Sequence, residues 1–366
     1  MKIIYTITGL TLGGAETITV NLATRMHELG HTVKLMFLSG EQCIQVPQEI
    51  ESINLCMKKN PIGFIKAIKK AKKIVKDFQP DVVHANMFHA IVFARALRLF
   101  VKVPRLICTE HSNNFHGRIR QIIEHCTDFL SDVNTNVSKN ATEYFVKKGL
   151  FSEAKAMTVY NGIDLQRFSK HANKRIRDEL NIEKSTFVFL NVSRLNPAKD
   201  HKTLIQAFSL VHKEQPDTKL ICVGDGDLLP MLKTFAEERD VSDSVIFTGA
   251  KTTVEDYYNA SNCFVLSSAY EGFGLVLAEA MACELPVIST DCGGTREILQ
   301  DDRWLVSIRN PEELSQKMLE IMHLSFEERK HIILKNLQKV KKFDLEAITQ
   351  QWLSIYKNQR SGAYEK

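Results

Sequence analysis

The chain has 366 residues, of which 44% are hydrophobic and 25% are charged. This balance is typical of a globular protein, and the length is enough for two domains that each bury a core. No apolar run reaches the roughly 20 residues that span a bilayer, and the N-terminus lacks the charged stretch and apolar core of a signal peptide. We therefore expect a cytoplasmic protein.

Charge is distributed unevenly between the two halves. Residues 1–168 hold 22 Lys and Arg against 14 Asp and Glu, whereas residues 169–366 hold 26 against 29. The eight cysteines are scattered and do not have the paired spacing of a zinc site, so they are expected to be reduced thiols. The basic first half favours an anionic partner for that half.

Short runs rich in Ile and Val alternate with longer segments of helical period. In the first half the expected strands are 2–7, 32–38, 82–85 and 105–108, and the expected helices are 15–29, 62–78 and 88–100. After a polar stretch the pattern restarts, with strands 187–192, 219–223, 245–247 and 263–266, helices 202–211 and 228–239, and a closing helix at 345–356. The alternation predicts two α/β domains with parallel sheets.

The first strand runs into a glycine-rich turn, residues 9–16, with the sequence GLTLGGAE. Backbone N–H groups left bare by such glycines at a helix N-terminus can bind a phosphate. A structural turn without a ligand explains the same glycines, so this motif alone leaves both interpretations open.

Residues 27–31, HELGH, match the H-E-x-x-H pattern of zinc proteases. That site needs both histidines on one face of an unbroken helix. Gly30 is expected to end the helix, and His31 then precedes a strand. The two histidines are therefore predicted to lie on different elements.

A second metal-like pattern is Asp225-Gly226-Asp227, which resembles a D-x-D motif that holds a divalent ion through two carboxylates. It follows a strand and precedes an apolar helical segment. The simpler interpretation is a strand-to-helix turn in which Asp227 caps the helix, and this turn requires no metal.

The most informative stretch joins the buried strand 263–266 to a helix through a glycine-rich loop. Glu271 at the strand end can hold sugar hydroxyls, Glu279 on the helix can hold a ribose diol, and the loop amides can hold a phosphate. Arg194 and Lys199 follow another strand and can neutralise a departing diphosphate. Each cation alone is better explained as a solvated loop residue. Together the four side chains predict a nucleotide-diphosphate site.

These motifs resemble those of the family 4 retaining glycosyltransferases over nearly the whole chain. The family's signature is a pair of glutamates with seven residues between them, as in Glu271 and Glu279. Further matches are Ser193-Arg194, Lys199, Gly224-Asp225-Gly226, Phe273-Gly274, Ala280-Met281-Ala282, Gly293-Gly294, Gly13-Gly14-Ala15-Glu16, His111, Ser138 and Asn161-Gly162-Ile163-Asp164. One departure is Glu284, where the family usually has Gly on a turn.

The resemblance implies the GT-B fold, an α/β architecture of two Rossmann-like domains that face one another across a cleft. The first domain, 1–165 joined by a helix in 345–366, would bind the acceptor, and the second, 166–344, would bind the donor. The implied catalytic residues are His111, Arg194, Lys199 and Glu271. The implied donor-binding residues are Gly13, Gly14, Gly224, Phe273, Gly274, Leu275 and Glu279, and Glu16 is the implied acceptor residue.

The resemblance also implies the reaction. A hexose or N-acetylhexosamine would move with retention from a nucleotide-diphosphate donor, with UDP favoured, to a glycan or lipid-linked glycan of bacterial lipopolysaccharide, O-antigen or capsule. No metal or other cofactor and no nucleic-acid partner are expected. Two other classes stay open: a UDP-sugar epimerase of the same architecture, and a non-catalytic nucleotide-sugar-binding protein.

Residues 64–76 form a basic amphipathic segment with the sequence FIKAIKKAKKIVK. Such a helix can lie on anionic lipid, which would place the protein on the inner face of the cytoplasmic membrane. A solvated helix that covers a core is the equal alternative.

Overall fold

The computed structural model describes residues 1–11, 13–111, 117–171 and 175–358. The chain divides into two compact units: Met1–Gly162 with the chain from Leu345 onward, and Ile163–Asp344. The first boundary lies at 162/163 rather than 165/166, because the Ile163 backbone N–H donates to the Phe343 carbonyl at 2.8 Å and Ile163 bridges to Asp344. Leu12 and residues 359–366, which belong to segments discussed above, lie outside the described residues.

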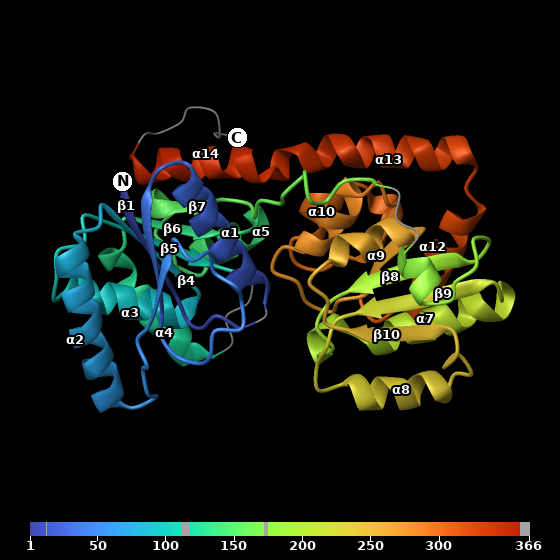
Figure 1. Cartoon of the computed structure of the whole chain (residues 1–366), viewed down its shortest axis with the longest axis horizontal. Helices are drawn as coiled ribbons and strands as arrows, with labels where there is room; N and C mark the ends of the chain where they lie inside the picture. Colours follow the sequence, from blue (N-terminus) through green and yellow to red (C-terminus); the bar gives the residue numbers. More distant parts are fainter. Residues whose placement is uncertain (12, 112–116, 172–174, 359–366) are drawn as a thin grey trace. The chain divides into compact units, whose positions relative to one another are not determined.

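The first unit contains a parallel sheet with the strand order β3-β2-β1-β4-β5-β6-β7 (Figure 1). Its strands are β1 (Lys2–Ile7), β2 (Thr32–Phe37), β3 (Glu51–Asn54), β4 (Val82–Asn86), β5 (Arg105–Glu110), β6 (Val133–Asn136) and β7 (Ala156–Thr158). Its helices are α1 (Gly14–Glu28), α2 (Pro61–Phe78), α3 (Phe88–Arg98), α4 (Arg118–Thr127), α5 (Lys139–Lys147) and α14 (Leu345–Tyr356), with the short 3-10 turns η1 (Asp128–Leu130) and η2 (Glu153–Lys155).

Two apolar clusters cover the two faces of this sheet. Ile3, Tyr5 and Ile7 of β1 pack with α1 and α14, whereas Ile4 of the same strand packs with α2 and α3. Strand side chains alternate between faces, so one strand supplies both clusters. The sheet is therefore the middle layer between α1 with α14 and α2 with α3.

Helix boundaries follow local chemistry. Asn60 caps α2 by accepting from the Gly63 N–H at 2.7 Å, and Pro61 occupies the first turn. After α1, Gly30 takes a left-handed φ of +82° and ends the helix, so His27 and His31 lie on different elements as predicted. Among the described helices, none is both long and apolar enough to cross a bilayer.

A buried chain of polar groups ties α14 to the sheet. The Tyr356 hydroxyl lies 2.9 Å from the Tyr5 hydroxyl and 2.7 Å from His84 Nδ1. His84 Nε2 lies 2.6 Å from Thr109 Oγ1, which lies 2.7 Å from Thr135 Oγ1. Burial lowers the pKa of His84 to about 3, so its imidazole is neutral. Every hydroxyl in this chain of polar groups has a hydrogen-bond partner, as buried polar groups require.

The second unit contains a parallel sheet with the strand order β10-β9-β8-β11-β12-β13. Its strands are β8 (Phe187–Val192), β9 (Thr218–Val223), β10 (Val245–Gly249), β11 (Cys263–Leu266), β12 (Val287–Thr290) and β13 (Leu305–Val306). Its helices are α6 (Arg175–Glu179), α7 (His201–Glu214), α8 (Leu229–Glu237), α9 (Val254–Ala260), α10 (Leu275–Ala282), α11 (Thr295–Leu299), α12 (Pro311–His323) and α13 (Phe326–Val340).

The predicted turn between β9 and α8 is present, but the predicted role of Asp227 is wrong. Leu228 occupies the N-cap position and no side chain caps the helix there. Gly224 and Gly226 have positive φ, and a Cβ on either would overlap the carbonyl oxygens of Ser193 and Leu195 respectively. The glycines are thus required by close packing of the β9–α8 turn on the loop after β8.

Candidate active site

The loops that follow β8 and β11 lie side by side at the carboxyl edge of the second sheet, because these two strands are neighbours. The Ala198 carbonyl accepts from the N–H groups of Ala269 and Tyr270 at 2.9 and 3.2 Å. Ser267 Oγ donates to the Lys199 carbonyl at 3.0 Å. These bonds hold the two loops together and bring two of the predicted catalytic side chains into contact.

Those two side chains are Lys199 and Glu271. Lys199 Nζ lies 2.6 Å from Glu271 Oε1, and Ser268 Oγ donates to the same oxygen at 2.7 Å. Glu271 is only 7% exposed, and a buried carboxylate is tolerated when it is paired and hydrogen-bonded. The cluster places a cation next to a fixed carboxylate. Such a pair can bind a diphosphate through the cation and sugar hydroxyls through the carboxylate. Ser268 was not predicted, although it is the second residue after the buried strand.

Arg194 is not joined to this cluster. Its side chain is exposed, and the part of the chain that the structure describes gives it no hydrogen bond or ion pair. The backbone beside it is fixed, since the Leu195 N–H donates to the Asp225 carbonyl at 2.9 Å. Arg194 is therefore an exposed cation beside a hydrogen-bonded backbone, where an anion can reach it from solvent.

The start of α10 presents backbone rather than side chains. Gly274 has a φ of +88°, and a Cβ there would lie 3.3 Å from Thr295 Cγ2. The Phe273 side chain is buried and its ring centroid lies 5.2 Å from that of Phe343. The backbone amides of Gly274 and Leu275 thus lie at the start of α10, where helix N–H groups can bind a ligand, while the Phe273 ring belongs to the core.

Glu279 lies one turn into α10 and is half-buried. Its Oε2 accepts from the buried Tyr258 hydroxyl at 2.8 Å. Burial raises the pKa of Glu279 to about 7, although the bond from Tyr258 and the nearby Arg167 act in the opposite direction. The carboxyl group therefore changes charge near neutral pH. Tyr258, on α9, has no sequence signal that links it to Glu279.

Gly224 has a structural explanation. Its N–H donates to the Gly249 carbonyl at 3.0 Å. A Cβ at this position would overlap the Ser193 carbonyl oxygen, so only glycine fits. The N–H group is thus already occupied in this structure.

In the first unit, Gly13 precedes α1 in an extended conformation and Gly14 is the first helical residue. Among the described residues no side chain makes a capping hydrogen bond to this helix, and N–H groups at such a position can bind an anion. Glu16, in the first turn, accepts from Thr11 Oγ1 at 3.1 Å. A Cβ on Gly13 would overlap Glu16 Oε2, so the Glu16 carboxylate lies against the start of α1.

His111 follows β5 directly. Its Nε2 lies 3.0 Å from Asn86 Oδ1, and its Nδ1 is buried with no hydrogen-bond partner among the described residues. Burial lowers the pKa of His111 to about 4, so the imidazole is neutral and Nδ1 accepts when Nε2 donates to Asn86. Both residues line a cavity of about 20 Å³. Asn86 was not predicted, although it ends the neighbouring strand β4.

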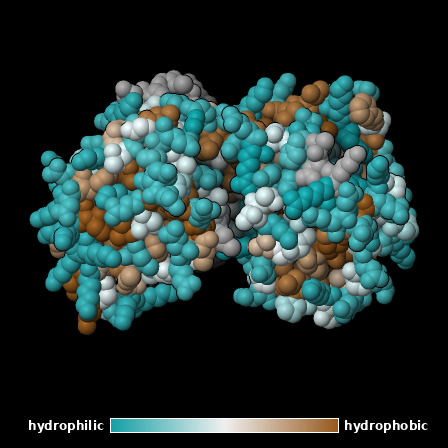
Figure 2. Space-filling view, in the orientation of Figure 1, coloured by the Kyte–Doolittle hydropathy of each residue, from teal (hydrophilic) through white to brown (hydrophobic). Residues whose placement is uncertain are grey.

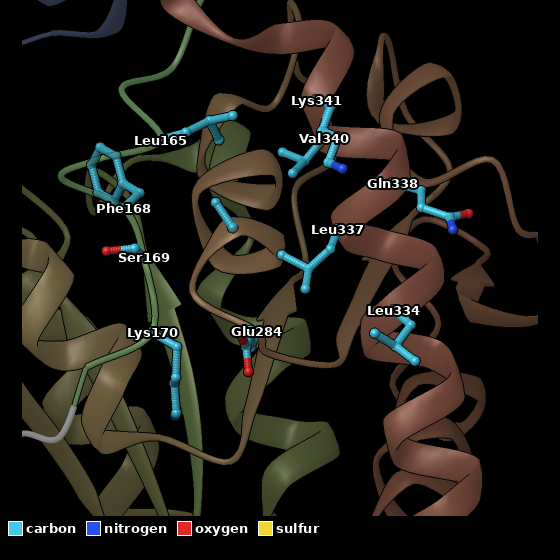
Figure 3. A pocket seen from close by; sticks show the side chains of 11 residues that line it. Leu165, Phe168, Ser169, Lys170, Glu284, Leu334, Leu337, Gln338, Val340 and Lys341 are labelled. Atoms are coloured by element: carbon cyan, nitrogen blue, oxygen red, sulfur yellow. The ribbon is translucent and has the colours of Figure 1, made fainter.

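A larger cavity of about 510 Å³ lies elsewhere in the second unit (Figure 3). Leu165 and Phe168 line it from one side, Glu284 from the turn after α10, and Leu337 and Val340 from α13. None of the predicted site residues lines it, so the cavity is separate from the cluster at the strand ends. Glu284 lies on a turn as predicted, and its φ of +61° explains why a glycine fits this position well.

The two Rossmann-like units, with paired charges at the carboxyl edge of the second sheet, define the class of GT-B glycosyltransferases. Solved structures with this fold superpose on nearly the whole chain. A glycosyltransferase from Rickettsia africae matches with a TM-score of 0.87 and 20% identity over 99% of both chains. The Anabaena protein HepE in complex with UDP matches with a TM-score of 0.84 and 20% identity over 98% of this chain and 100% of its own.

Residues 12–167 match the model described as Glycosyltransferase Family 4, and residues 172–339 match the model described as Glycosyl transferases group 1. The chain belongs to these glycosyltransferases. An uncharacterised glycosyltransferase of Methanocaldococcus jannaschii is 29% identical over 65% of this chain, and the alignment covers 63% of that protein. A Campylobacter jejuni N-acetylgalactosaminyltransferase, named for a diphospho-undecaprenol-linked substrate, is 27% identical over 83% of this chain and 85% of its own length.

Proposed function

We propose that the protein transfers a hexose or N-acetylhexosamine, with retention, from a UDP-linked donor to a glycan or lipid-linked glycan of bacterial lipopolysaccharide, O-antigen or capsule. The observation that carries this proposal is the buried cluster of Lys199, Glu271 and Ser268 at the carboxyl edge of the second sheet. The solved complexes of Anabaena HepE with UDP and with UDP-glucose support a UDP donor. The acceptor class is supported by relatives whose names specify undecaprenol-diphosphate glycans.

In this proposal the second unit holds the donor. Lys199 and Arg194 balance the charge of the leaving diphosphate, and Glu271 binds hydroxyls of the transferred sugar. The backbone amides of residues 273–275 bind phosphate oxygens, and Glu279 binds the ribose diol. The transition state separates an oxocarbenium-like sugar from an anionic diphosphate, so fixed groups aimed at these charges lower the barrier.

The first unit holds the acceptor. The N-terminus of α1, at Gly13 and Gly14, contributes donors for the diphosphate, and Glu16 binds an acceptor hydroxyl. His111 positions the reacting sugar as a neutral imidazole, because burial keeps its pKa near 4. We further propose that the reaction needs no metal, since Lys199 and Arg194 provide the positive charge, and that it takes place at the inner face of the cytoplasmic membrane.

The test is transfer with defined substrates. Purified protein is incubated with a panel of UDP- and GDP-sugars and lipid-linked acceptors, and the products are identified by mass spectrometry and by the anomeric coupling constant in NMR. We expect one acceptor to gain one sugar in the donor's anomeric configuration, with release of nucleoside diphosphate. Conversion of the donor to an isomer without transfer would instead show an epimerase, and binding without turnover would show a nucleotide-sugar-binding protein.

A further inference from the structure

Helix α4 buries a charged side chain and exposes apolar ones, which is the reverse of an ordinary surface helix. Its one buried residue is a charged one, Glu124, while Ile119 and Ile122 are 75% and 61% exposed. Phe129, in the following turn η1, is 70% exposed, and Cys126 is exposed as well. These four residues follow the spacing i, i+3, i+7 and i+10, which places them on one stripe. We call Ile119, Ile122, Cys126 and Phe129 the α4 stripe.

The buried side of α4 explains why the stripe faces outward. Arg95 on α3 is fully buried, and its Nη1 lies 2.7 Å from Glu124 Oε1. The same guanidinium donates to Thr127 Oγ1 at 3.0 Å and to Asn134 Oδ1 at 2.9 Å. A rotation that buried the isoleucines would leave the Arg95 guanidinium uncompensated, which is strongly unfavourable. The ion pair thus fixes the stripe on the surface.

The part of the chain that contains the stripe is basic. Between residues 58 and 155 the chain holds 18 Lys and Arg against eight Asp and Glu. Two of the eight, Glu124 and Asp128, face Arg95, and Asp132 pairs with Arg98 at 2.8 Å. Exposed cations on the same helix are Arg118 and Arg120. An apolar stripe with a cationic margin matches a surface with anionic headgroups and an apolar interior.

The first turns of α2 continue this surface. In a parallel sheet with crossover helices, every helix begins at the carboxyl edge of the strands, so α2 and α4 begin at the same edge. Ile62 and Ile65 of α2 are 68% and 53% exposed, beside the exposed Lys66. Figure 2, in the orientation of Figure 1, shows hydrophobic surface at the lower left, where one end of α2 lies. His111, at the end of β5, marks the same edge.

We propose that the α4 stripe inserts into the hydrocarbon boundary of an anionic bilayer, with the first turns of α2 beside it. The proposal rests on the proposed function in one respect: a lipid-linked acceptor would reach His111 from the surface in which the stripe is embedded. It adds an apolar mode of attachment to the electrostatic one expected from the α2 lysines. Binding therefore has a part that salt does not remove, since salt screens charges and leaves apolar burial in place.

Insertion is tested with a tryptophan reporter in the full chain. The native Trp304 and Trp352 are 1% and 5% exposed, so they are shielded from lipid. In Ile122→Trp the added indole should be quenched by vesicles of phosphatidylcholine and phosphatidylglycerol that carry brominated acyl chains. The matched control is Leu99→Trp, because Leu99 is 64% exposed but follows α3 at the opposite edge of the sheet. Equal quenching of both reporters, or none at Trp in position 122, overturns the proposal.

The salt-resistant part is tested by sedimentation with the same vesicles at high salt. Ile119→Gln combined with Ile122→Gln should lower the partition coefficient by about tenfold for each side chain removed, whereas Leu99→Gln with Phe100→Gln should leave it unchanged. Glutamine is a good helix former, so the exposed substitutions leave α4 folded, as circular dichroism will verify. Unchanged binding overturns the proposal. A concentration-dependent dimer that the α4 variant abolishes also overturns it, in favour of a contact between two copies. Neither measurement uses a donor or an acceptor. A negative result would therefore count against membrane insertion alone, whereas the proposed function is tested separately by sugar transfer to a soluble acceptor.

Discussion

Glu271 is a buried carboxylate whose charge is balanced by a neighbouring cation. Strand β11 brings it to the sheet edge, Ser268 donates to it, and Lys199 from the neighbouring loop supplies the opposite charge. The pair joins residues that are 72 positions apart. A pair of this kind is the natural target for a first mutational test.

Lys199→Ala should slow turnover by roughly 100-fold or more, because loss of a charge-stabilising donor costs about 3 kcal/mol in the transition state. The measurement is kcat for sugar transfer, on protein whose fold has been checked by circular dichroism. Lys202→Ala is the matched control, since Lys202 is exposed three residues further along. Near-normal kcat in Lys199→Ala would exclude the proposed role.

The Gln variants of Glu271 and Glu279 should have different kinetic defects. A contact that is equal in ground and transition states affects mainly KM, whereas a contact that strengthens in the transition state affects kcat. Glu279→Gln should therefore raise the donor KM with kcat nearly intact, and Glu271→Gln should lower kcat. A Glu271→Gln enzyme with normal kcat and only a raised donor KM would remove Glu271 from the reacting sugar.

The pKa of Glu279, raised by burial to about 7, adds a pH test. The group is protonated below that pH and then loses its capacity to accept from both ribose hydroxyls. The donor KM should consequently rise as the pH falls from 8 to 6, values that bracket this pKa. Glu279→Gln should flatten the profile. A wild-type KM that does not change across this interval would show that Glu279 does not touch the donor.

At the scale of elements, α14 belongs to the first unit although it follows the second in the chain. Its attachment depends on Tyr356, which lies between Tyr5 and His84 in the buried polar chain. Trp352 adds a ring contact, with its centroid 4.5 Å from that of His84. The helix is thus held by this polar network, by the bond that Arg25 Nε on α1 donates to Glu346 Oε2 at 2.9 Å, and by the apolar cluster around it.

Tyr356→Phe should lower the free energy of unfolding by about 2 kcal/mol, because it leaves buried partners on His84 and Tyr5 unsatisfied. Chemical denaturation followed by fluorescence gives the value. Ser354→Ala is the control on the same helix, since Ser354 bonds only to a helix carbonyl among the described residues. Equal stability of Tyr356→Phe and wild type would show that the polar chain contributes nothing to the attachment of α14.

Helix α2 has the amphipathic structure that its sequence predicts, with Ala67, Ala71 and Val75 buried and its lysines outside. Changing Lys66, Lys69, Lys70 and Lys73 to Gln should weaken binding to anionic vesicles at low salt, by about 1 kcal/mol per lysine close to the surface. The control changes four exposed lysines of the second unit: Lys213, Lys233, Lys330 and Lys335. Equal binding of wild type to neutral vesicles would indicate a solvated helix instead.

At the scale of the whole molecule, each unit has its own sheet and its own apolar core, and the positive charge is concentrated in the first. The proposal that Lys199 and Arg194 balance the diphosphate predicts that transfer persists in EDTA. Product formation is measured with chelated enzyme and with the same enzyme after magnesium or manganese is restored. Complete loss in EDTA that either ion reverses would show that a divalent cation shares this role.

The sequence by itself determined the fold class, the strands and helices with strong periodicity, and the glutamate pair of the donor motif. Strands β1, β8 and β11 and helix α14 begin and end where the pattern predicts. These features are local: alternation, helical period and a motif within one loop depend on residues that are close in the chain. The same locality explains why the end of α1 at Gly30 was predictable.

Only the tertiary structure decided which side chains meet. The contacts of Asn86 with His111, Tyr258 with Glu279 and Tyr356 with His84 join different elements, and no spacing in the chain encodes them. The cap assigned to Asp227 was wrong because the turn is set by glycines that pack on the loop after β8. Helix α4 is the strongest case. Its apolar stripe would pack inward by pattern alone, and the buried Arg95 partner of Glu124 turns it outward because an unpaired buried charge costs more than exposed isoleucine.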